Sequence, residues 1–562
     1  MKKFGLCTLA TLMLAVSTHV VAAPLRATLF VNGDIITVND KQPLAEALVV
    51  RDGKIAGVGS RDEMSAIAGK DAVIRDLKGK SLLPGFIDSH GHFTYTNRLQ
   101  LSANVSSPPV GSAETIADVI RLLKEHHQRM PEESWIQGYG YDDSLLTEGR
   151  HPTREDLDKV SSTVPVVITH VSGHLLSCNS VCLERAGIDA STEAPAGGVI
   201  RRKAGGREPD GVLEETAMYP VMHSLPALDV PSQVALLEQT QRDYASYGIT
   251  TVQDGAAMAE PLEILYAAAD AQKLFVDVIA FPYMSLTLEG LEQHPPSAEY
   301  RNHLRIGGMK VTLDGSPQGK TAWLTKPYYH PPHGQGADYA GYPTLTDEQA
   351  RAFVDYAFEN GVPLLAHANG DAASDQMIEA VAAAREKFGR ADRRPVMIHA
   401  QTVREDQIDS MLEEGIVPSY FVAHTFYWGD WHRDSVLGEK RASRISPLRS
   451  SADKGLPFTI HNDTPVVPAD MMRLLWTAVN RVTRSGKVLG KEQRATVMEG
   501  IRAMTLDGAY QNFEENSKGS LETGKRADLV ILDRNPLKVE PMAIKDILVL
   551  ETIKDGETIY RR

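Results

Sequence analysis

The sequence predicts an α/β fold: a (β/α)8 TIM-like barrel, a small sheet domain built from both chain termini, and an inserted cap region. Three observations support this prediction. The central part alternates short apolar runs with helical stretches, the two ends share a hairpin pattern, and a long stretch inside the central part breaks the alternation. At 562 residues the chain is too long for one compact core, so more than one domain is expected.

The barrel is assigned to residues 83–514 because alternating β and α segments on this scale indicate a parallel sheet. Eight runs have strand character: VPVVITH, GITTVQD, FVDVIAF, IGGMKVTLD, GVPLLAH, RPVMIHA, GIVPSY and LPFTIHND. Catalytic groups of such a barrel lie at the carboxyl ends of the strands. A doubly wound open sheet is the alternative, but no Gly-x-Gly-x-x-Gly turn follows the first strand.

The small sheet domain is assigned to residues 24–82 and 515–562. Both segments contain short alternating strands separated by Asn-Gly and Asp-Gly turns, which is the pattern of β-hairpins. A long middle without this pattern separates them. We therefore expect the two ends to meet in one domain.

An insertion at about residues 100–240 interrupts the barrel pattern. It has helices and strands of its own together with glycine-rich turns, and we interpret it as a cap. The run VPVVITH within it could instead be a barrel strand, and the sequence leaves this open.

The first 23 residues have the pattern of a secretory signal peptide. Lys2 and Lys3 precede an apolar run from Phe4 to Val16, and small residues follow up to Ala23. The run is too short to span a bilayer as a helix. We therefore expect export across the inner membrane to the periplasm, with no membrane anchor after cleavage.

Composition favours a small-molecule partner. The formal charge of −14 argues against nucleic acid or an anionic membrane as the main partner. Whether the chain forms a homodimer is left open.

Two cysteines, Cys178 and Cys182, remain after signal cleavage. They lie four residues apart in a segment, 175–186, that has a helical pattern and would place both on one face. A periplasmic disulfide is one interpretation, but helical geometry is awkward for it. We predict two unpaired, packed thiols.

His90 and His92 stand in the motif LLPGFIDSHGHF, at the end of an apolar strand-like run. Alternate residues of a strand share a face, so both imidazoles would point the same way and form half of a metal site. Further polar residues stand at later strand ends: Lys310, His367, His399 and Asp463. Each alone could be an ordinary salt-bridged, packed or helix-capping residue, whereas their joint placement indicates a metal site.

These motifs resemble the amidohydrolase superfamily, and more closely its YtcJ-like branch, the amidohydrolase 3 group. The resemblance covers nearly the whole mature chain, from LLPGFIDSHGHF through GHLLSCNSVCLERAGI, KVTLDGSPQGKTAWLTKPY, LLAHANGDAA and IHAQ to GSLETGKRADLVILD. It implies a metal-dependent hydrolase on a (β/α)8 barrel with a β-sandwich built from both termini.

The resemblance also implies roles for individual residues. His90, His92 and Asp463 would hold one divalent transition metal, with zinc the first candidate and iron, manganese and nickel open. His367 and His399 would hold a second ion, bridged to the first if Lys310 is carboxylated. Water bound to the metal would attack as hydroxide, and Asp463 would act as general base and then general acid.

One departure from the family pattern is His461, where the family commonly has a small residue. His461 shares strand parity with Asp463 and could be a ligand, a substrate contact or a packed imidazole. Other candidates for substrate contact are His174, in a segment shared with the family, and His424 and Trp428, in an aromatic cluster after one strand.

The predicted function is hydrolysis of a carbon-nitrogen bond other than a peptide bond, in an amide, N-acyl amine or N-formyl amine. An esterase or lactonase at the same metal centre is the second enzymatic interpretation. A non-catalytic periplasmic binding or regulatory protein is a third.

Overall fold

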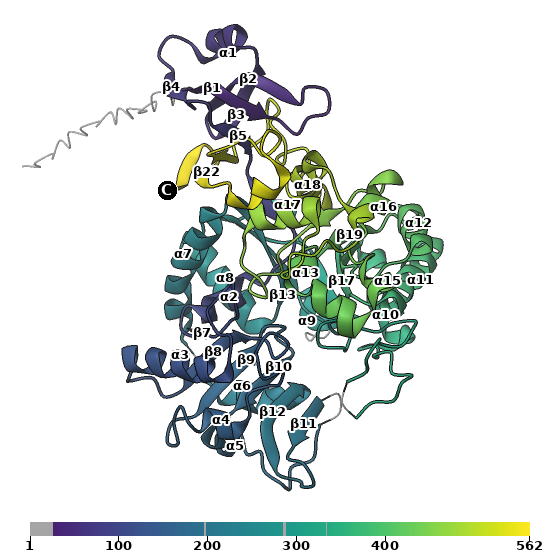
Figure 1. Ribbon diagram of the computed structural model, residues 1–562. Coiled ribbons are helices and arrows are strands. Elements are labelled where there is room, and N and C mark those ends of the chain that lie inside the picture. Colours follow the sequence, from purple (N-terminus) through teal and green to yellow (C-terminus); the bar gives the residue numbers. More distant parts are fainter. Residues whose placement is uncertain (1–25, 196–197, 227, 285–287, 333) are drawn as a thin grey trace, which may run out of the picture.

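The structure is a computed structural model that describes residues 26–195, 198–226, 228–284, 288–332 and 334–562. The predicted signal peptide lies outside these ranges. The two ends of the described chain meet in one mixed sheet of eight strands, at the top of Figure 1. Its strands are β1 (Thr28–Ile36), β2 (Leu44–Arg51), β3 (Lys54–Gly59), β4 (Val73–Asp76), β5 (Ser81–Pro84), β21 (Leu529–Leu532), β22 (Val549–Lys554) and β23 (Glu557–Arg561).

The join between the two ends is the pairing of β5 with β21, which runs antiparallel from Ser81 to Pro84. The Asp-Gly pairs form the tight hairpin turns that the sequence predicts. A positive φ is found at both residues of each turn. These residues are Asp52 and Gly53 between β2 and β3, and Asp555 and Gly556 between β22 and β23. Type I′ turns require this conformation, which explains the Asp-Gly sequence. The prediction that both termini contribute to one β domain is confirmed.

The central part contains two parallel sheets. The first has the order β15-β14-β13-β6 and the second the order β16-β17-β18-β19-β20. Their bounds are β6 (Phe86–Asp88), β13 (Ile249–Ala257), β14 (Asp277–Pro282), β15 (Leu304–Ile306), β16 (Met309–Thr312), β17 (Leu364–Ala368), β18 (Val396–His399), β19 (Val417–Tyr420) and β20 (Thr459–Ile460).

Two sets of contacts connect these sheets. A parallel bridge joins Tyr283, just after β14, to Lys310 in β16. At the other side, the Asp463 amide after β20 donates to the carbonyl of His90 after β6 at 3.1 Å. The carboxyl ends of β6 and β20 are therefore held together, although they belong to different sheets.

Helices connect the parallel strands, as the alternation in the sequence predicts. In chain order they are α7 (Val230–Ser246), α8 (Ala259–Asp270), α9 (Leu288–Glu292), α10 (Asp347–Asn360), α11 (Asp371–Phe388), α12 (Glu405–Glu414) and α16 (Leu448–Asp453). Local sequence sets their ends: α10 begins behind Thr346, which forms a capping box with Gln349, and ends at Gly361 in the left-handed conformation. The faces turned toward the strands carry the buried apolar core.

Further helices complete the central and terminal parts. They are α1 (Arg61–Ala68), α2 (Phe93–Leu99), α13 (His424–Tyr427), α14 (Gly429–Trp431), the π-helical η2 (His432–Val436), α15 (Glu439–Ala442), α17 (Met471–Asn480), η3 (Lys491–Gln493), α18 (Val497–Ala503), α19 (Leu506–Gln511) and η4 (Pro541–Asp546). Among the described residues, no helix is long and apolar enough to cross a bilayer.

The insertion forms a sheet of its own, at the bottom of Figure 1, with the order β11-β12-β10-β9-β8-β7. Its strands are β7 (Ala103–Asn104), β8 (Ile136–Tyr141), β9 (Val166–His170), β10 (Leu175–Cys178), β11 (Gly198–Arg202) and β12 (Pro209–Glu215). Its helices are α3 (Ile116–Arg129), α4 (Arg154–Leu157), α5 (Ser180–Arg185), η1 (Thr216–Met218) and α6 (Tyr219–Ser224). The run VPVVITH contains β9, which pairs with β8 and β10, so its interpretation as a barrel strand is wrong.

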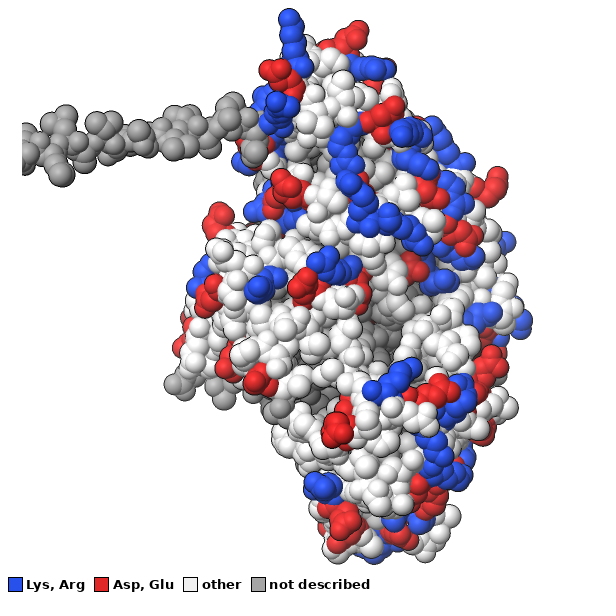
Figure 2. Space-filling view, turned by 90° about the vertical axis from the view of Figure 1, so that its left-hand side faces the viewer, with Lys and Arg blue, Asp and Glu red and all other residues white. Residues whose placement is uncertain are grey.

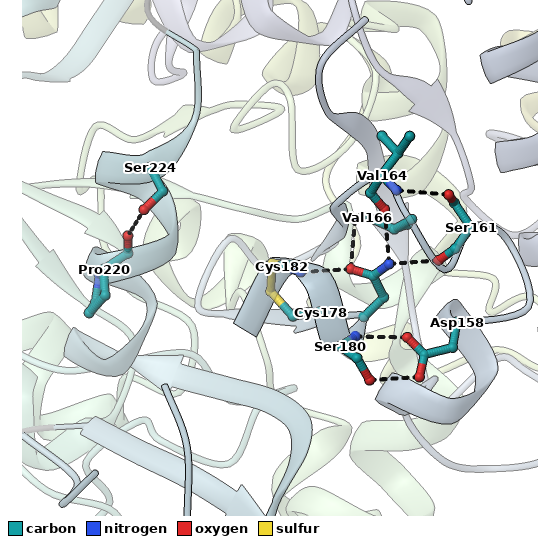
Figure 3. Close-up of a disulfide and its surroundings, with 10 residues drawn as sticks. Asp158, Ser161, Val164, Val166, Cys178, Ser180, Cys182, Pro220 and Ser224 are labelled. Carbon is teal, nitrogen blue, oxygen red and sulfur yellow. Dashed lines mark hydrogen bonds between the residues drawn. A yellow bond between two sulfur atoms is a disulfide. The ribbon is translucent and has the colours of Figure 1, made fainter. Parts of the chain in front are cut away.

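The two cysteines differ from the prediction of unpaired thiols on one helix. Cys178 ends β10 and Cys182 lies in α5, and the two form a disulfide (Figure 3). Asn179 separates the two elements as the N-cap of α5, since its side chain accepts from the Cys182 amide at 2.9 Å. Residues 175–178 pair with β9 and β12 instead of continuing the helix, which brings the Cα atoms to 5.5 Å.

Candidate metal centre

His90 and His92 lie at the carboxyl end of β6, in the short connection to α2. Asp463 reaches them from the segment after β20. Its Oδ1 atom is 3.2 Å from Nε2 of His92 and 3.6 Å from Nε2 of His90. The three residues that the sequence assigns to one ion are therefore brought together. Two of them follow β6 of the first parallel sheet, and the third follows β20 of the second.

The side chains of this group suit a divalent cation. Oδ1 of Asp463 is buried and has no hydrogen-bond partner, so a charged oxygen is left facing the two imidazoles. Ligand atoms held about 2.1 Å from a tetrahedral ion lie about 3.4 Å apart, which matches the spacings of this group. Burial, with the neighbouring Lys310, holds the pKa of His90 well below its usual range, so His90 is the neutral imidazole that binds metals.

Two residues of β13 orient His90. The side-chain oxygen of Gln253 lies 3.4 Å from Nδ1 of His90. Gly255 packs directly under the ring, because a Cβ at this position would stand 2.2 Å from Cε1 of His90. Only glycine allows the imidazole to occupy its place.

Lys310 points into the same centre from β16. Its Nζ atom lies 3.2 Å from Nε2 of His90, and the residue is 2% exposed. Burial lowers the pKa of Lys310 to about 7, although Asp463 opposes the shift. Near neutral pH, Lys310 is therefore a neutral amine in a large fraction of the molecules. Only this neutral form can react with carbon dioxide.

His367 and His399 form a second histidine pair, at the ends of β17 and β18. Nδ1 of His367 lies 3.1 Å from Nε2 of His399, and the two rings meet edge to face. Burial lowers the pKa of both, to about 3 for His367, and the charge of Lys310 acts in the same direction. Both imidazoles are therefore neutral.

His461 extends this pair. Its Nε2 atom lies 3.2 Å from Nδ1 of His399, and its Nδ1 atom lies 2.8 Å from Oγ of Ser419. The residue is fully buried. The structure thus places His461 against a predicted ligand.

Two residues of the centre adopt a backbone conformation that is uncommon outside glycine. His399 has a φ of 73° and Asp463 a φ of 56°. Such conformations are costly and concentrate at functional sites, where the surrounding structure maintains them. In both cases the positive φ changes the direction of the backbone at the residue whose side chain reaches the centre.

Asp314 supports the centre, although the sequence analysis assigns it no role. Asp314 accepts from the amides of Trp323, Asn369 and Gly370, and its Oδ1 atom lies 3.5 Å from Nε2 of His367. Burial raises the pKa of Asp314 to about 7. Such partners orient metal ligands. The motif KVTLDGS contains Asp314 two residues beyond β16, which is the signal that could have identified it.

The predicted substrate residues occupy different surroundings. His174 in the insertion is partly exposed and lies 3.1 Å from the Glu215 carboxylate. Burial alone would lower its pKa, but Glu215 outweighs this effect and raises it, with a smaller contribution from Asp463. His424 is buried against Phe421 and contacts His432 at 2.9 Å, and the Trp428 indole donates to Asp142 at 2.8 Å. Nδ1 of His424 and the indole nitrogen of Trp428 are thus engaged within the protein.

A cavity of about 360 Å³ opens beside the centre. Thr464 and Pro465, which directly follow Asp463, line it together with Leu99 of α2, Tyr139 of β8 and Tyr244 of α7. Figure 2 views the side of the molecule that carries α7 and α2 in Figure 1, and it shows charged side chains of both signs around a mostly uncharged area. A small molecule with an apolar group would fit such a cavity.

Comparisons with known proteins identify relatives that match nearly the whole chain. The N-substituted formamide deformylase of Arthrobacter pascens is 29% identical over 96% of this chain and 99% of its own length. The putative amidohydrolase YtcJ of Bacillus subtilis is 26% identical over 94% of this chain and 98% of its own. A solved structure, an uncharacterized metal-dependent hydrolase from Pyrococcus horikoshii, superposes with a TM-score of 0.73 at 25% identity, covering 92% of this chain and 99% of that one.

The profile of the amidohydrolase family, Amidohydro_3, matches residues 73–560, which is most of the sequence and includes every residue of the centre described above. The resemblance that the sequence motifs indicate is therefore confirmed. The chain belongs to the amidohydrolase family and is a metal-dependent hydrolase.

Proposed function

We propose that this enzyme hydrolyses the carbon-nitrogen bond of an N-formyl or N-acyl amine, with N-substituted formamides as the first substrate class. The observation that carries the proposal is the unpartnered Oδ1 atom of Asp463, buried within 3.6 Å of both histidines of the first strand. Similarity along nearly the full length to a formamide deformylase supports the substrate class.

His90, His92 and Asp463 would hold the first divalent ion. We propose that this ion is zinc. His367 and His399 would hold a second ion, with Lys310, once carboxylated, between them. A divalent ion bound there supplies a Lewis acid that polarises the substrate carbonyl and lowers the pKa of a water molecule.

Asp463 moves the proton in this proposal. The attacking water adds its oxygen to the carbonyl carbon, and the carboxylate of Asp463 accepts the proton that is released. When the C–N bond breaks, Asp463 returns this proton to the nitrogen. An amine anion is a poor leaving group, so an amide depends on this transfer, and the products of a formamide are formate and a free amine.

The cavity beside Asp463 supports an apolar substituent on the nitrogen. Leu99, Tyr139, Tyr244 and Val467 contribute apolar or aromatic surface to its lining, and Thr464 joins it to the centre. Aromatic and aliphatic groups gain free energy by leaving water for such a surface. We therefore propose N-benzyl and N-alkyl formamides as better substrates than unsubstituted formamide.

The architecture and location belong to the same proposal. The parallel strands from β6 to β20 would close into a (β/α)8 barrel, and the hydrogen bond between Asp463 and His90 supports this closure. The terminal sheet would fold as the β-sandwich. The N-terminal pattern would direct the enzyme to the periplasm, where small molecules are its partners. A homodimer is compatible with this proposal.

The direct test is a panel of N-formyl and N-acyl amines, with simple esters beside them, assayed for release of both products with and without a chelator. We expect chelator-sensitive release of amine and formate, lost in His92→Asn and retained in the control His223→Gln, which changes an exposed histidine of α6. Hydrolysis of esters with no C–N substrate cleaved would contradict the assignment.

The number of ions is tested separately. Lys310→Ala should lose one equivalent of metal relative to the wild type, whereas Lys387→Ala, an exposed lysine of α11, should lose none. An unchanged metal content with full activity in Lys310→Ala would show that the bridging role is wrong.

A further inference from the structure

A second group of histidine and carboxylate side chains lies in the insertion. Asp142 and Asp143 directly follow β8, and His170 ends the neighbouring parallel strand β9. Because the carboxyl ends of parallel strands meet at one edge of a sheet, the three side chains converge. One nitrogen of His170 and one oxygen from each carboxylate lie within 4.8 Å of one another.

The spacing of these atoms resembles that of the first centre. Nε2 of His170 lies 3.2 Å from Oδ1 of Asp143 and 4.0 Å from Oδ1 of Asp142. The corresponding separations between Asp463 and its two histidines are 3.2 and 3.6 Å. Both sets bracket the roughly 3.4 Å expected between ligands of one tetrahedral ion.

The imidazole of His170 is aimed at the carboxylates without forming a hydrogen bond to them. The residue is 4% exposed, and Nε2 is buried with no hydrogen-bond partner. Its Nδ1 atom accepts from the Ser172 amide at 3.1 Å and lies 2.8 Å from Oγ of the same residue, so Ser172 orients the ring. Nε2 is left facing the two carboxylates.

The charge of the two carboxylates also lacks a direct partner. Among the described residues, no lysine or arginine forms an ion pair with Asp142 or Asp143. Asp142 is buried, and its oxygens accept from Ser144 and from the indole of Trp428. The Asp143 side chain is 31% exposed, so the cost of burying a charge falls mainly on Asp142, and a bound cation would balance that charge.

His151 supports the Asp143 carboxylate from the side that faces away from His170. Its Nε2 atom lies 3.5 Å from Oδ2 of Asp143, and its Nδ1 atom lies 3.2 Å from the hydroxyl of Tyr141. The imidazole of His170 and the two carboxylates form a mixed nitrogen and oxygen set that suits zinc and other first-row transition ions.

We propose that Asp142, Asp143 and His170 form a second metal site that binds a divalent transition ion such as zinc. The ion would join the ends of β8 and β9 at the place where Asp142 accepts from Trp428. It would therefore fix the insertion to the segment of α13 and α14, and its role would be to position the insertion.

The test compares zinc content after equilibrium dialysis of the full chain. His170→Gln and Asp143→Asn should each bind about one equivalent less than the wild type, whereas His223→Gln should bind the same amount. His90→Asn combined with His170→Gln should lose more than either single variant, since the two sites are separate. Anomalous scattering from wild-type crystals at the zinc edge should place a peak between Asp143 and His170.

Zinc content that is unchanged in both His170→Gln and Asp143→Asn would overturn the site. If His170→Gln fails to fold, the isosteric Asp143→Asn and the anomalous map of the wild type decide the question. A map with zinc at Asp463 and none at Asp143 would overturn it equally.

Discussion

Oδ1 of Asp463 lies 3.2 Å from Nε2 of His92, and no hydrogen bond uses this oxygen. The two residues follow strands of different sheets, and the Asp463 amide donates to the His90 carbonyl, which fixes the approach. The backbone conformation of Asp463 is itself uncommon. The carboxylate is thus held in place by the backbone, ready to bind a cation and to carry a proton.

Asp463→Asn tests this arrangement. The amide side chain keeps the shape but cannot accept and return a proton, so we expect kcat for formamides to fall by about 10²- to 10⁴-fold. Steady-state kinetics with metal analysis of the same samples would measure this. The control is Asp453→Asn, an exposed residue of α16. A variant that keeps its metal and its kcat would contradict the role of Asp463.

Gly255→Ala tests the support beneath His90. The added methyl group would meet the ring at 2.2 Å, so either the imidazole or β13 must move. We expect weaker metal binding and at least a tenfold loss of activity, with a melting temperature that falls little in the absence of metal. Gly206→Ala is the matched control, because like Gly255 it has no positive φ, and its added Cβ would meet no atom closer than 3.9 Å. Equal metal affinity in Gly255→Ala and the wild type would argue against the proposed close contact.

The pKa of Lys310 predicts a pH dependence for reconstitution. Burial lowers this pKa to about 7, and only the neutral amine reacts with carbon dioxide. The neutral fraction is about one tenth at about pH 6 and about nine tenths at about pH 8. Metal-free enzyme given zinc and bicarbonate should therefore regain activity several-fold faster at the higher pH. Lys310→Ala should show no bicarbonate effect, and a wild-type rate independent of bicarbonate would rule out carboxylation.

Asp277→Asn tests how the central strands are joined to the terminal sheet. Asp277 begins β14 and lies 2.6 Å from Nζ of Lys518 and 3.1 Å from Nζ of Lys554 in β22. Burial alone would raise the pKa of Asp277, but these ammonium groups outweigh it and hold the pKa well below 3.8. Removing one partner of a buried ion cluster costs about 3–5 kcal/mol, so urea should unfold the variant at lower concentration at neutral pH.

The sign of the pH effect follows from the lowered pKa. The stabilisation by Asp277 is complete above the unfolded pKa of 3.8 and is lost as the pH falls through the lower folded value. The difference in unfolding free energy between wild type and Asp277→Asn should be constant from about pH 5 to about pH 8 and shrink below about pH 4. A difference that grows with acid would contradict the assignment.

The residues that the sequence identified are those whose position in the chain reveals their role. His367, His399 and Lys310 stand in or at the end of apolar runs, and parallel strands bring such positions together whatever the connecting loops do. Gln253, Gly255 and Asp314 were missed, because their role depends on which ring each one meets across the sheet. Periodicity within one segment carries no information about that neighbour.

The cysteines show the same limit. Residues 175–186 have a helical pattern, but residues 175–178 gain more by pairing with β9 and β12. Asn179 then begins the helix, and the disulfide follows from the turn between the two elements. Tertiary pairing overrides a local preference of this size.

The most direct test of the account is the metal content of the purified enzyme and its activity before chelation, after chelation and after return of zinc. We predict at least one equivalent of a transition ion that depends on His92 and Asp463, loss of amine release on chelation, and recovery on reconstitution. Full C–N hydrolysis by enzyme holding less than about a tenth of an equivalent would contradict the central claim.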